Sequence, residues 1–206
     1  MLELFLSAFV TLFVVIDPPG CAPIYAGLTA GATPAQRRSM AIRACVIAGA
    51  ILLGFALFGE QLLSALHIEL DAFRTAGGIM LFMIAIDMVF EKRTQRRADR
   101  ADKVREDPEI EDVSVFPMAM PMLAGPGAIA SIMLLEGTAM GTEGTLVVLA
   151  ALGAVLVLTL LALLAASPLM KLFGAQVETV ITRLLGVLLA ALAAQYVIDG
   201  VRGSFF

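Results

Sequence analysis

Long apolar runs separated by short polar segments make up almost the whole chain. A helix of about 20 apolar residues spans the ~30 Å hydrocarbon core of a bilayer. Runs of this kind, two of them interrupted, predict six spans, at residues 1–30, 40–59, 72–90, 113–140, 145–166 and 180–198. The pattern therefore predicts an all-α membrane protein with six transmembrane helices.

A charged segment at residues 91–112 separates the first three predicted spans from the last three. Among its many acids it carries seven basic residues, Lys92, Arg93, Arg96, Arg97, Arg100, Lys103 and Arg105. Runs of mixed charge are usually solvated or loosely helical. We therefore expect residues 1–90 and 113–206 to form two three-helix repeats, joined by a solvated cytoplasmic linker without an activity of its own.

Two short segments interrupt the first and the fourth predicted spans. They read Asp17-Pro18-Pro19-Gly20, followed by Cys21, and Ala124-Gly125-Pro126-Gly127. Proline removes a backbone donor and glycine permits conformations that other residues avoid, so each segment breaks a helix. In hydrocarbon, such backbone persists only where it is buried in protein or lines a polar cavity. We expect the two breaks to face each other near the middle of the membrane, either as broken spans or as re-entrant half-helices.

The two halves share a second motif besides the Pro-Gly pair. The pattern Glu-x4-Arg-x2-Gly occurs at residues 69–77 and again at 178–186. Because each half has three predicted spans, the second half must cross the membrane upside down relative to the first. Inverted repeats with helices interrupted in matching positions mark the midplane binding site of many transporters. The sequence therefore predicts an inverted repeat with a solute site at the breaks.

The chemistry of a broken helix suggests what this site binds. Freed amides at the start of a half-helix suit a carboxylate, and freed carbonyls suit an ammonium group or a cation. Asp17 is an ionisable residue at membrane depth, which binds an ammonium group or Na⁺, carries a proton, or only caps the following half-helix. The candidate substrate-binding residues are Asp17, Pro18, Pro19, Gly20, Cys21, Ala124, Gly125, Pro126 and Gly127.

Composition narrows the class of protein. Hydrophobic residues make up 60% of the chain and charged residues 16%, against about a half and about a quarter in soluble domains. The two cysteines and the single histidine show no metal or redox spacing, and no Gly-x4-Gly-Lys-Ser/Thr loop occurs. We therefore expect no enzyme, cofactor, metal or nucleic-acid partner. A membrane redox carrier and a non-transporting structural or assembly protein stay as alternatives.

The basic residues predict the orientation in the membrane, because Lys and Arg concentrate in short cytoplasmic loops. Arg37, Arg38 and Arg43 flank the first loop, the charged linker follows the third span, and Lys171 lies after the fifth. These alternate loops share one side of the membrane. Both termini are therefore predicted to be periplasmic.

At the two breaks the chain resembles the MarC family of bacterial inner-membrane proteins, also called the neutral amino acid transporter family. The likeness lies in the length, the six-span layout, the Asp-Pro-x-Gly break and the segment from Pro121 to Ile129, and it covers essentially the whole chain. The family commonly has Asn where this chain has Cys21.

The resemblance implies transport of small neutral amino acids. We expect an integral inner-membrane secondary transporter or exporter of a small, zwitterionic solute, surrounded by the lipid bilayer. A coupling ion, either H⁺ or Na⁺, and a homo-oligomer are compatible with this expectation.

Overall fold

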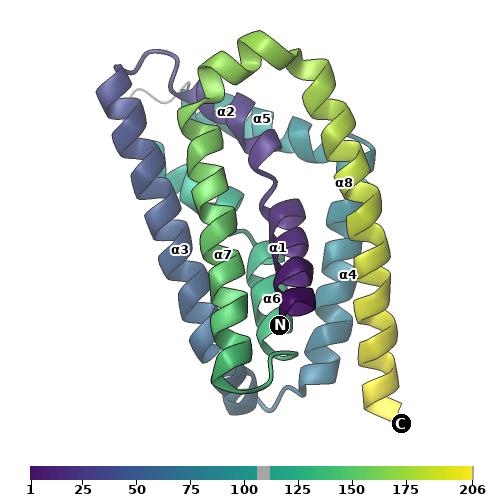
Figure 1. Cartoon of the computed structure of the whole chain (residues 1–206). Coiled ribbons are helices and arrows are strands. Elements are labelled where there is room, and N and C mark those ends of the chain that lie inside the picture. Colours follow the sequence, from purple (N-terminus) through teal and green to yellow (C-terminus); the bar gives the residue numbers. More distant parts are fainter. Residues whose placement is uncertain (106–111, 206) are drawn as a thin grey trace.

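The computed structural model describes residues 1–105 and 112–205, which form a bundle of helices without a strand among them (Figure 1). The elements are α1 (Leu2–Ile16), α2 (Pro18–Leu28), α3 (Pro34–Ala65), α4 (Leu70–Val89), α5 (Lys92–Arg105), the irregular helix η1 (Ser114–Leu123), α6 (Pro126–Glu136), α7 (Gly141–Leu164) and α8 (Ala166–Phe205).

Within the described ranges, five helical stretches are long and apolar enough to cross a membrane. One of them joins α1 and α2 into a stretch of 27 residues, Leu2–Leu28. The pair of η1 and α6, bent by 52°, makes a sixth when it is counted as one span. The chain is thus an all-helical, multi-pass membrane protein with five to six candidate spans.

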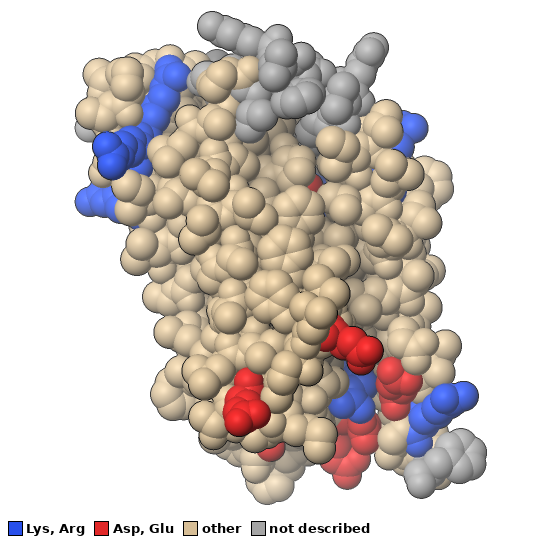
Figure 2. Space-filling view, viewed as in Figure 1, with Lys and Arg blue, Asp and Glu red and all other residues tan. Residues whose placement is uncertain are grey.

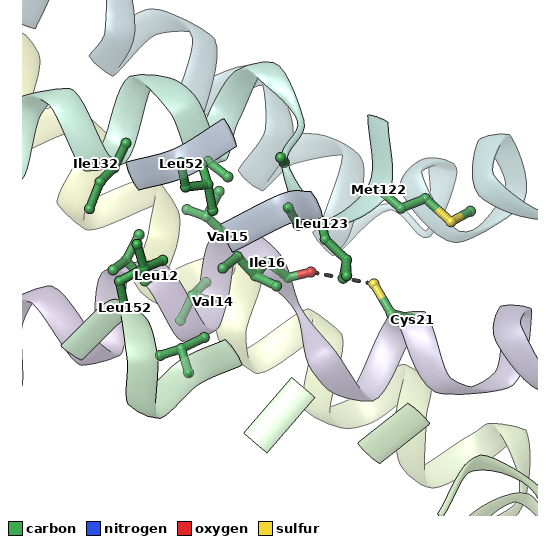
Figure 3. Close-up of a cluster of buried hydrophobic side chains, with 14 of the residues drawn as sticks. Leu12, Val14, Val15, Ile16, Cys21, Leu52, Met122, Leu123, Ile132 and Leu152 are labelled. Atoms are coloured by element: carbon green, nitrogen blue, oxygen red, sulfur yellow. Dashed lines mark hydrogen bonds between the residues drawn. The ribbon is translucent and has the colours of Figure 1, made fainter. Parts of the chain in front are cut away.

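The long helices run side by side, and α1 and α6 lie in the middle of the bundle (Figure 1). Helix α4 packs along α8, and α1 packs on α7. Helices α2 and α5 lie towards the same end of the bundle, where they contact each other. The last turns of α1 are central, because Leu12, Val14, Val15 and Ile16 are all buried among side chains of α3, α6 and α7 (Figure 3).

Small residues allow α4 and α8 to pack closely. A Cβ atom at Gly78 of α4 would lie 2.9 Å from the carbonyl oxygen of Ala193, and one at Gly186 of α8 would lie 2.9 Å from Cβ of Met88. Early residues of α4 therefore face late residues of α8, and the two helices are antiparallel. Such close approach through small residues is the usual way in which membrane helices associate.

Several elements extend beyond their predicted bounds. Helix α3 begins at Pro34 rather than near residue 40, because Thr33 and Gln36 form a reciprocal capping box and Pro34 suits the first turn. Helix α2 begins at Pro18, so the prolines open this helix instead of lying in a gap before it. Helix α8 is also longer than the predicted sixth span.

The charged segment differs most from its prediction. Residues 92–105 form helix α5, which packs against α2 and α4, and Arg97 is only 7% exposed. The helical form was one of the expected ones, and most described side chains of α5 are exposed, but the burial of Arg97 was not expected. Residues 106–111 of the predicted linker lie outside the described residues.

Candidate functional site

The first break is a single residue, Asp17, which ends α1 and begins α2. Its φ of 60° and ψ of 63° place it in the left-handed region, where Asp is enriched among residues other than glycine. Its Oδ1 accepts a hydrogen bond from the amide of Gly20 at 3.1 Å and so caps α2. A Cβ atom at Gly20 would lie 2.3 Å from Oδ2 of Asp17. The motif needs glycine there because the capping carboxylate folds over this position.

The prolines free a carbonyl group that α5 then binds. In a continuous helix the carbonyl of Val15 would accept from residue 19, but Pro19 has no N–H. Arg93 of α5 donates from Nη2 to this oxygen instead. The carbonyl of Ile16 has also lost its helical donor, because the Gly20 amide bonds to Asp17. Cys21 fills this place, with Sγ 3.5 Å from the Ile16 oxygen (Figure 3).

A buried ion pair connects the first break to α5. Nη1 of Arg97 lies 3.0 Å from Oδ2 of Asp17, and the two side chains are only 8% and 2% exposed. Taking two charges out of water is unfavourable unless they are paired with good geometry, which this contact provides. The cap and the ion pair together use both oxygens of Asp17. Its predicted capping role is present in the structure, in combination with a charge partner that the sequence analysis missed.

The second break has a different construction. Phe116 and Met120 have extended φ and ψ values inside η1 because each precedes a proline, which disfavours the helical region. Gly125 then occupies the position before α6 and supplies no side-chain cap. A Cβ atom there would lie 2.4 Å from the carbonyl oxygen of Pro121, so only glycine fits.

The start of α6 keeps unbonded backbone donors. Its first residue, Pro126, has no N–H. The first amide of this helix that donates to a backbone carbonyl is that of Ile129, which bonds to the carbonyl oxygen of Gly125. Among the described residues, none accepts a hydrogen bond from the amide of Gly127 or Ala128. A helix end of this kind carries partial positive charge and attracts anions.

A cavity of about 170 Å³ lies between the two breaks. Its wall is formed by the end of α1, by α4, by α5 and by the second break, through Val15, Ile84, Asp87, Arg93, Arg96, Arg97, Pro121, Met122, Gly125, Pro126, Gly127 and Ala128. A Cβ atom at Gly127 would lie 3.3 Å from Cγ1 of Val15, so the breaks meet at this point.

The candidate residues from the sequence divide into three groups around this cavity. Gly125, Pro126 and Gly127 line it, and Ala124 is buried next to them. Asp17 reaches it indirectly, through Arg97. Pro18 to Cys21 form the first turn of α2 and are not among its lining residues.

The arginines of α5 make the cavity positive. Arg96 pairs with Asp87 and Arg97 with Asp17, so three arginines face two aspartates. Burial and, to a smaller extent, the neighbouring charge of Arg97 lower the pKa of the Arg93 guanidinium to about 10, against the opposing charge of Asp17. Arg93 therefore stays protonated at neutral pH, and the described groups at the cavity, with Asp17 counted through its pair with Arg97, leave one positive charge unbalanced.

Sequence reasoning missed these arginines because it treated the charged segment as one solvated unit. A usable signal was present. Arg93 and Arg97 are four residues apart and share one face of a helix, and no Gly or Pro interrupts residues 92–105. What the pattern does not contain is the direction in which that face points.

The comparisons with known proteins agree on one family. The model of the MarC family, integral membrane proteins, matches residues 2–205. The chain belongs to the MarC family. A UPF0056 membrane protein of Methanocaldococcus jannaschii is 36% identical over 98% of both chains. The UPF0056 membrane protein YvbG of Bacillus subtilis is 34% identical over 100% of this chain and 97% of its own.

A third family member links the fold to a particular membrane. The UPF0056 inner membrane protein YhgN of Escherichia coli K12 is 32% identical over 96% of this chain and 95% of its own. No solved structure matches the chain. Membership of this family therefore establishes an integral membrane protein, and the geometry of the cavity has to suggest the activity.

Proposed function

We propose that this MarC-family protein is a secondary transporter or exporter of a small zwitterionic solute, such as a neutral amino acid. The observation that carries the proposal is the cavity between the two breaks, lined by Val15 on one side and by Gly125 to Gly127 on the other. Interrupted helices meeting at a polar cavity are the usual setting of a transporter's binding site. The solute site would comprise this cavity and the Asp17 break behind it.

The size of the cavity supports a small substrate. Its volume is about 170 Å³, and a cavity of about 150 Å³ in a protein interior accommodates benzene, a molecule of about six non-hydrogen atoms. Alanine has the same number of non-hydrogen atoms. A compact neutral amino acid fits this volume.

We also propose that residues 1–90 and 113–206 are inverted repeats. In support, each half begins with an interrupted helical pair, α1 with α2 and η1 with α6. The third helices of the halves, α4 and α8, lie antiparallel. Alternating access would then arise from rocking of one half against the other around the breaks.

The distribution of charge supports the proposed orientation. Figure 2 shows basic side chains mainly near the end of the bundle where α2 and α5 lie, acidic side chains mainly near the opposite end, and an uncharged band between them. By the positive-inside rule the basic end faces the cytoplasm. The C-terminus lies at the other end (Figure 1), so we propose periplasmic termini in an inner membrane. A fusion reporter that places the C-terminus in the cytoplasm would contradict this.

Transport by purified protein in liposomes tests the main proposal. Liposomes containing the protein should accumulate or exchange radiolabelled L-alanine or another small neutral amino acid, with imposed H⁺ and Na⁺ gradients as separate arms. Asp17→Asn should strongly reduce flux, because it removes the charge that pairs with Arg97. The matched control is Asp71→Asn, which alters an aspartate–arginine pair on α4 outside the cavity.

Two results would count against parts of this proposal. Unchanged flux in the Asp17→Asn protein would remove Asp17 from coupling and leave it only a capping role. Absence of flux for every small neutral amino acid, under either gradient, would contradict transport and favour a structural or assembly role for the protein.

A further inference from the structure

Among the described residues, the guanidinium of Arg93 is the arginine charge at the cavity that has no direct carboxylate partner. Arg96 and Arg97 each contact an aspartate. Arg93 donates to the Val15 carbonyl and, at 3.0 Å, to the thioether sulfur of Met88, and both acceptors are neutral. Among the described residues, no carboxylate lies within ion-pair distance of it. Charged groups inside proteins are normally paired, and a thioether is a weak acceptor, so Arg93 has binding capacity left.

We propose that Arg93, together with the first amides of α6, forms the subsite that binds the carboxylate of the transported solute. This inference rests on the proposed function and adds to it the group that selects the substrate. A guanidinium presents five N–H donors in a planar fork that matches a carboxylate, and two of these donors are used by Val15 and Met88.

Helix α6 supplies the second half of the subsite. It has 11 residues, and the amides of Gly127 and Ala128 lack acceptors among the described residues while both residues line the same cavity as Arg93. The glycines at 125 and 127 let Pro121, Ile84 and Val15 pack closely against this helix end, which holds its backbone at the wall of the cavity. The arginine and the helix end are separate elements that direct positive charge into one space.

The balance of charge favours a carboxylate over a more highly charged anion. Among the described residues, three arginines and two aspartates leave one positive charge at the cavity. A carboxylate neutralises this charge, whereas a phosphate dianion would exceed it. The ammonium group of a zwitterion would then face away from Arg93. The inferred ligand is a small molecule with one carboxylate, and Arg93 is its specificity-determining residue.

Ligand-induced thermal stabilisation of the detergent-solubilised protein tests the inference. Cys21 and Cys45 are both buried, so a thiol-reactive fluorogenic dye reports unfolding when they become accessible. The probes are L-alanine, sodium propionate, L-alaninamide and sodium chloride at matched ionic strength. A ligand that binds the folded state raises Tm, by an amount that grows with the logarithm of one plus the ratio of free ligand concentration to Kd. L-alanine and propionate should raise Tm, and alaninamide and chloride should not.

Variants of Arg93 separate binding from stability. Arg93→Gln also removes the bond to Val15 and lowers the basal Tm, but a purely structural residue would leave the shift caused by L-alanine unchanged. We expect Arg93→Gln to abolish this shift or to weaken apparent binding at least about tenfold. Arg93→Lys should retain part of it, because the charge remains while the fork is lost. Arg183→Gln, an exposed arginine outside the cavity lining, is the matched control and should behave as wild type.

The outcomes separate this inference from the proposed function. Equal stabilisation by alaninamide or chloride, no shift with any probe, or a full L-alanine shift in Arg93→Gln would overturn the carboxylate subsite. Transport of L-alanine could still be measured in liposomes in each of these cases, so the transporter proposal would stand or fall by its own test. If Arg93→Gln does not fold, the comparison of probes on the wild type and on Arg93→Lys decides the question.

Discussion

The two breaks satisfy their freed backbone groups in opposite ways. At the first break, side chains make the observed contacts: Asp17 caps α2, Arg97 neutralises Asp17, and Arg93 and Cys21 bind two of the carbonyls freed at the end of α1. At the second break, Gly125 offers no side-chain cap, and the first amides of α6 face a cavity instead.

The difference shows that two interrupted helices can have different roles in one site, one holding a fixed conformation and the other keeping groups available for a ligand. A break whose groups are bound by side chains is held in one conformation, and it has little capacity left for a ligand. A break with unbonded amides has that capacity. Helix α5 joins the two, because Arg97 pairs with Asp17 of the closed break, and Arg93, four residues earlier, bonds to the Val15 carbonyl there and also lines the cavity at the open break. The predictions below test this contrast.

Loss of the buried ion pair should have the largest effect on stability. Arg97→Ala leaves Asp17 as a buried, uncompensated charge, and breaking one partner of such a pair costs about 3–5 kcal/mol. Unfolding in detergent monitored by circular dichroism measures the change. Arg96→Ala is the control, since its pair with Asp87 has an arginine side chain that is 63% exposed, and it should cost at most about 1 kcal/mol. Equal losses of unfolding free energy in the two variants would mean that the buried Asp17–Arg97 pair stabilises the protein no more than the exposed pair does.

The glycines of the two breaks should respond differently to a methyl group. Gly20→Ala and Gly125→Ala should each lower the free energy of unfolding by about 1–3 kcal/mol. The size of the loss is similar, but its cause differs between the two positions. At Gly20 the added Cβ meets the carboxylate of Asp17, whereas at Gly125 it meets the backbone oxygen of Pro121.

A double-mutant comparison distinguishes these two mechanisms. In an Asp17→Ala background the obstructing carboxylate is gone, so Gly20→Ala should lose most of its effect while Gly125→Ala keeps all of it. The measurement is the change in Tm for the four single and double variants against wild type and Asp17→Ala. Additive effects of Asp17→Ala and Gly20→Ala would contradict the contact between these two positions.

The sequence predicted most of the fold, but of the residues that line the cavity it named only Gly125, Pro126 and Gly127 as site residues. Apolar run lengths located the spans, and the Pro and Gly residues marked both breaks, because these residue types act through the backbone wherever they stand. The charged segment shows the limit. Charge pattern places Arg93 and Arg97 on one helix face, but only tertiary packing decides that this face turns towards α1 and α4 rather than water.

Cysteine 21 offers a smaller test of the closed break. Its thiol bonds weakly to the carbonyl of Ile16 at 3.5 Å, so Cys21→Ala should leave that buried oxygen without a donor and cost about 1 kcal/mol. Cys21→Ser keeps a donor of similar size and should recover much of the loss. Thermal unfolding of the three proteins measures the difference. A serine variant as unstable as the alanine variant would show that packing of the sulfur, rather than its hydrogen bond, stabilises this turn.

The smallest change in Tm should come from substitution of Asp112, the acid that precedes the second break. This change should depend on pH. Asp112 accepts from the amide of Ser114 at 2.9 Å and pairs with Arg43, and its side chain is 43% exposed, whereas that of Asp17 is 2% exposed.

Hydrogen bonds from Ser114 and the charge of Arg43 lower the pKa of Asp112 below its usual value, against an opposing effect of burial. A carboxyl with a lowered folded pKa stabilises the protein above its unfolded pKa, about 3.9 for Asp, and this contribution is lost as pH falls through the folded pKa. Asp112→Asn should therefore lower Tm slightly at pH 7, and this difference should shrink as pH falls below about 3.9 and vanish below the folded pKa. A loss as large as that of Arg97→Ala would mean that the second break, too, depends on a charged cap.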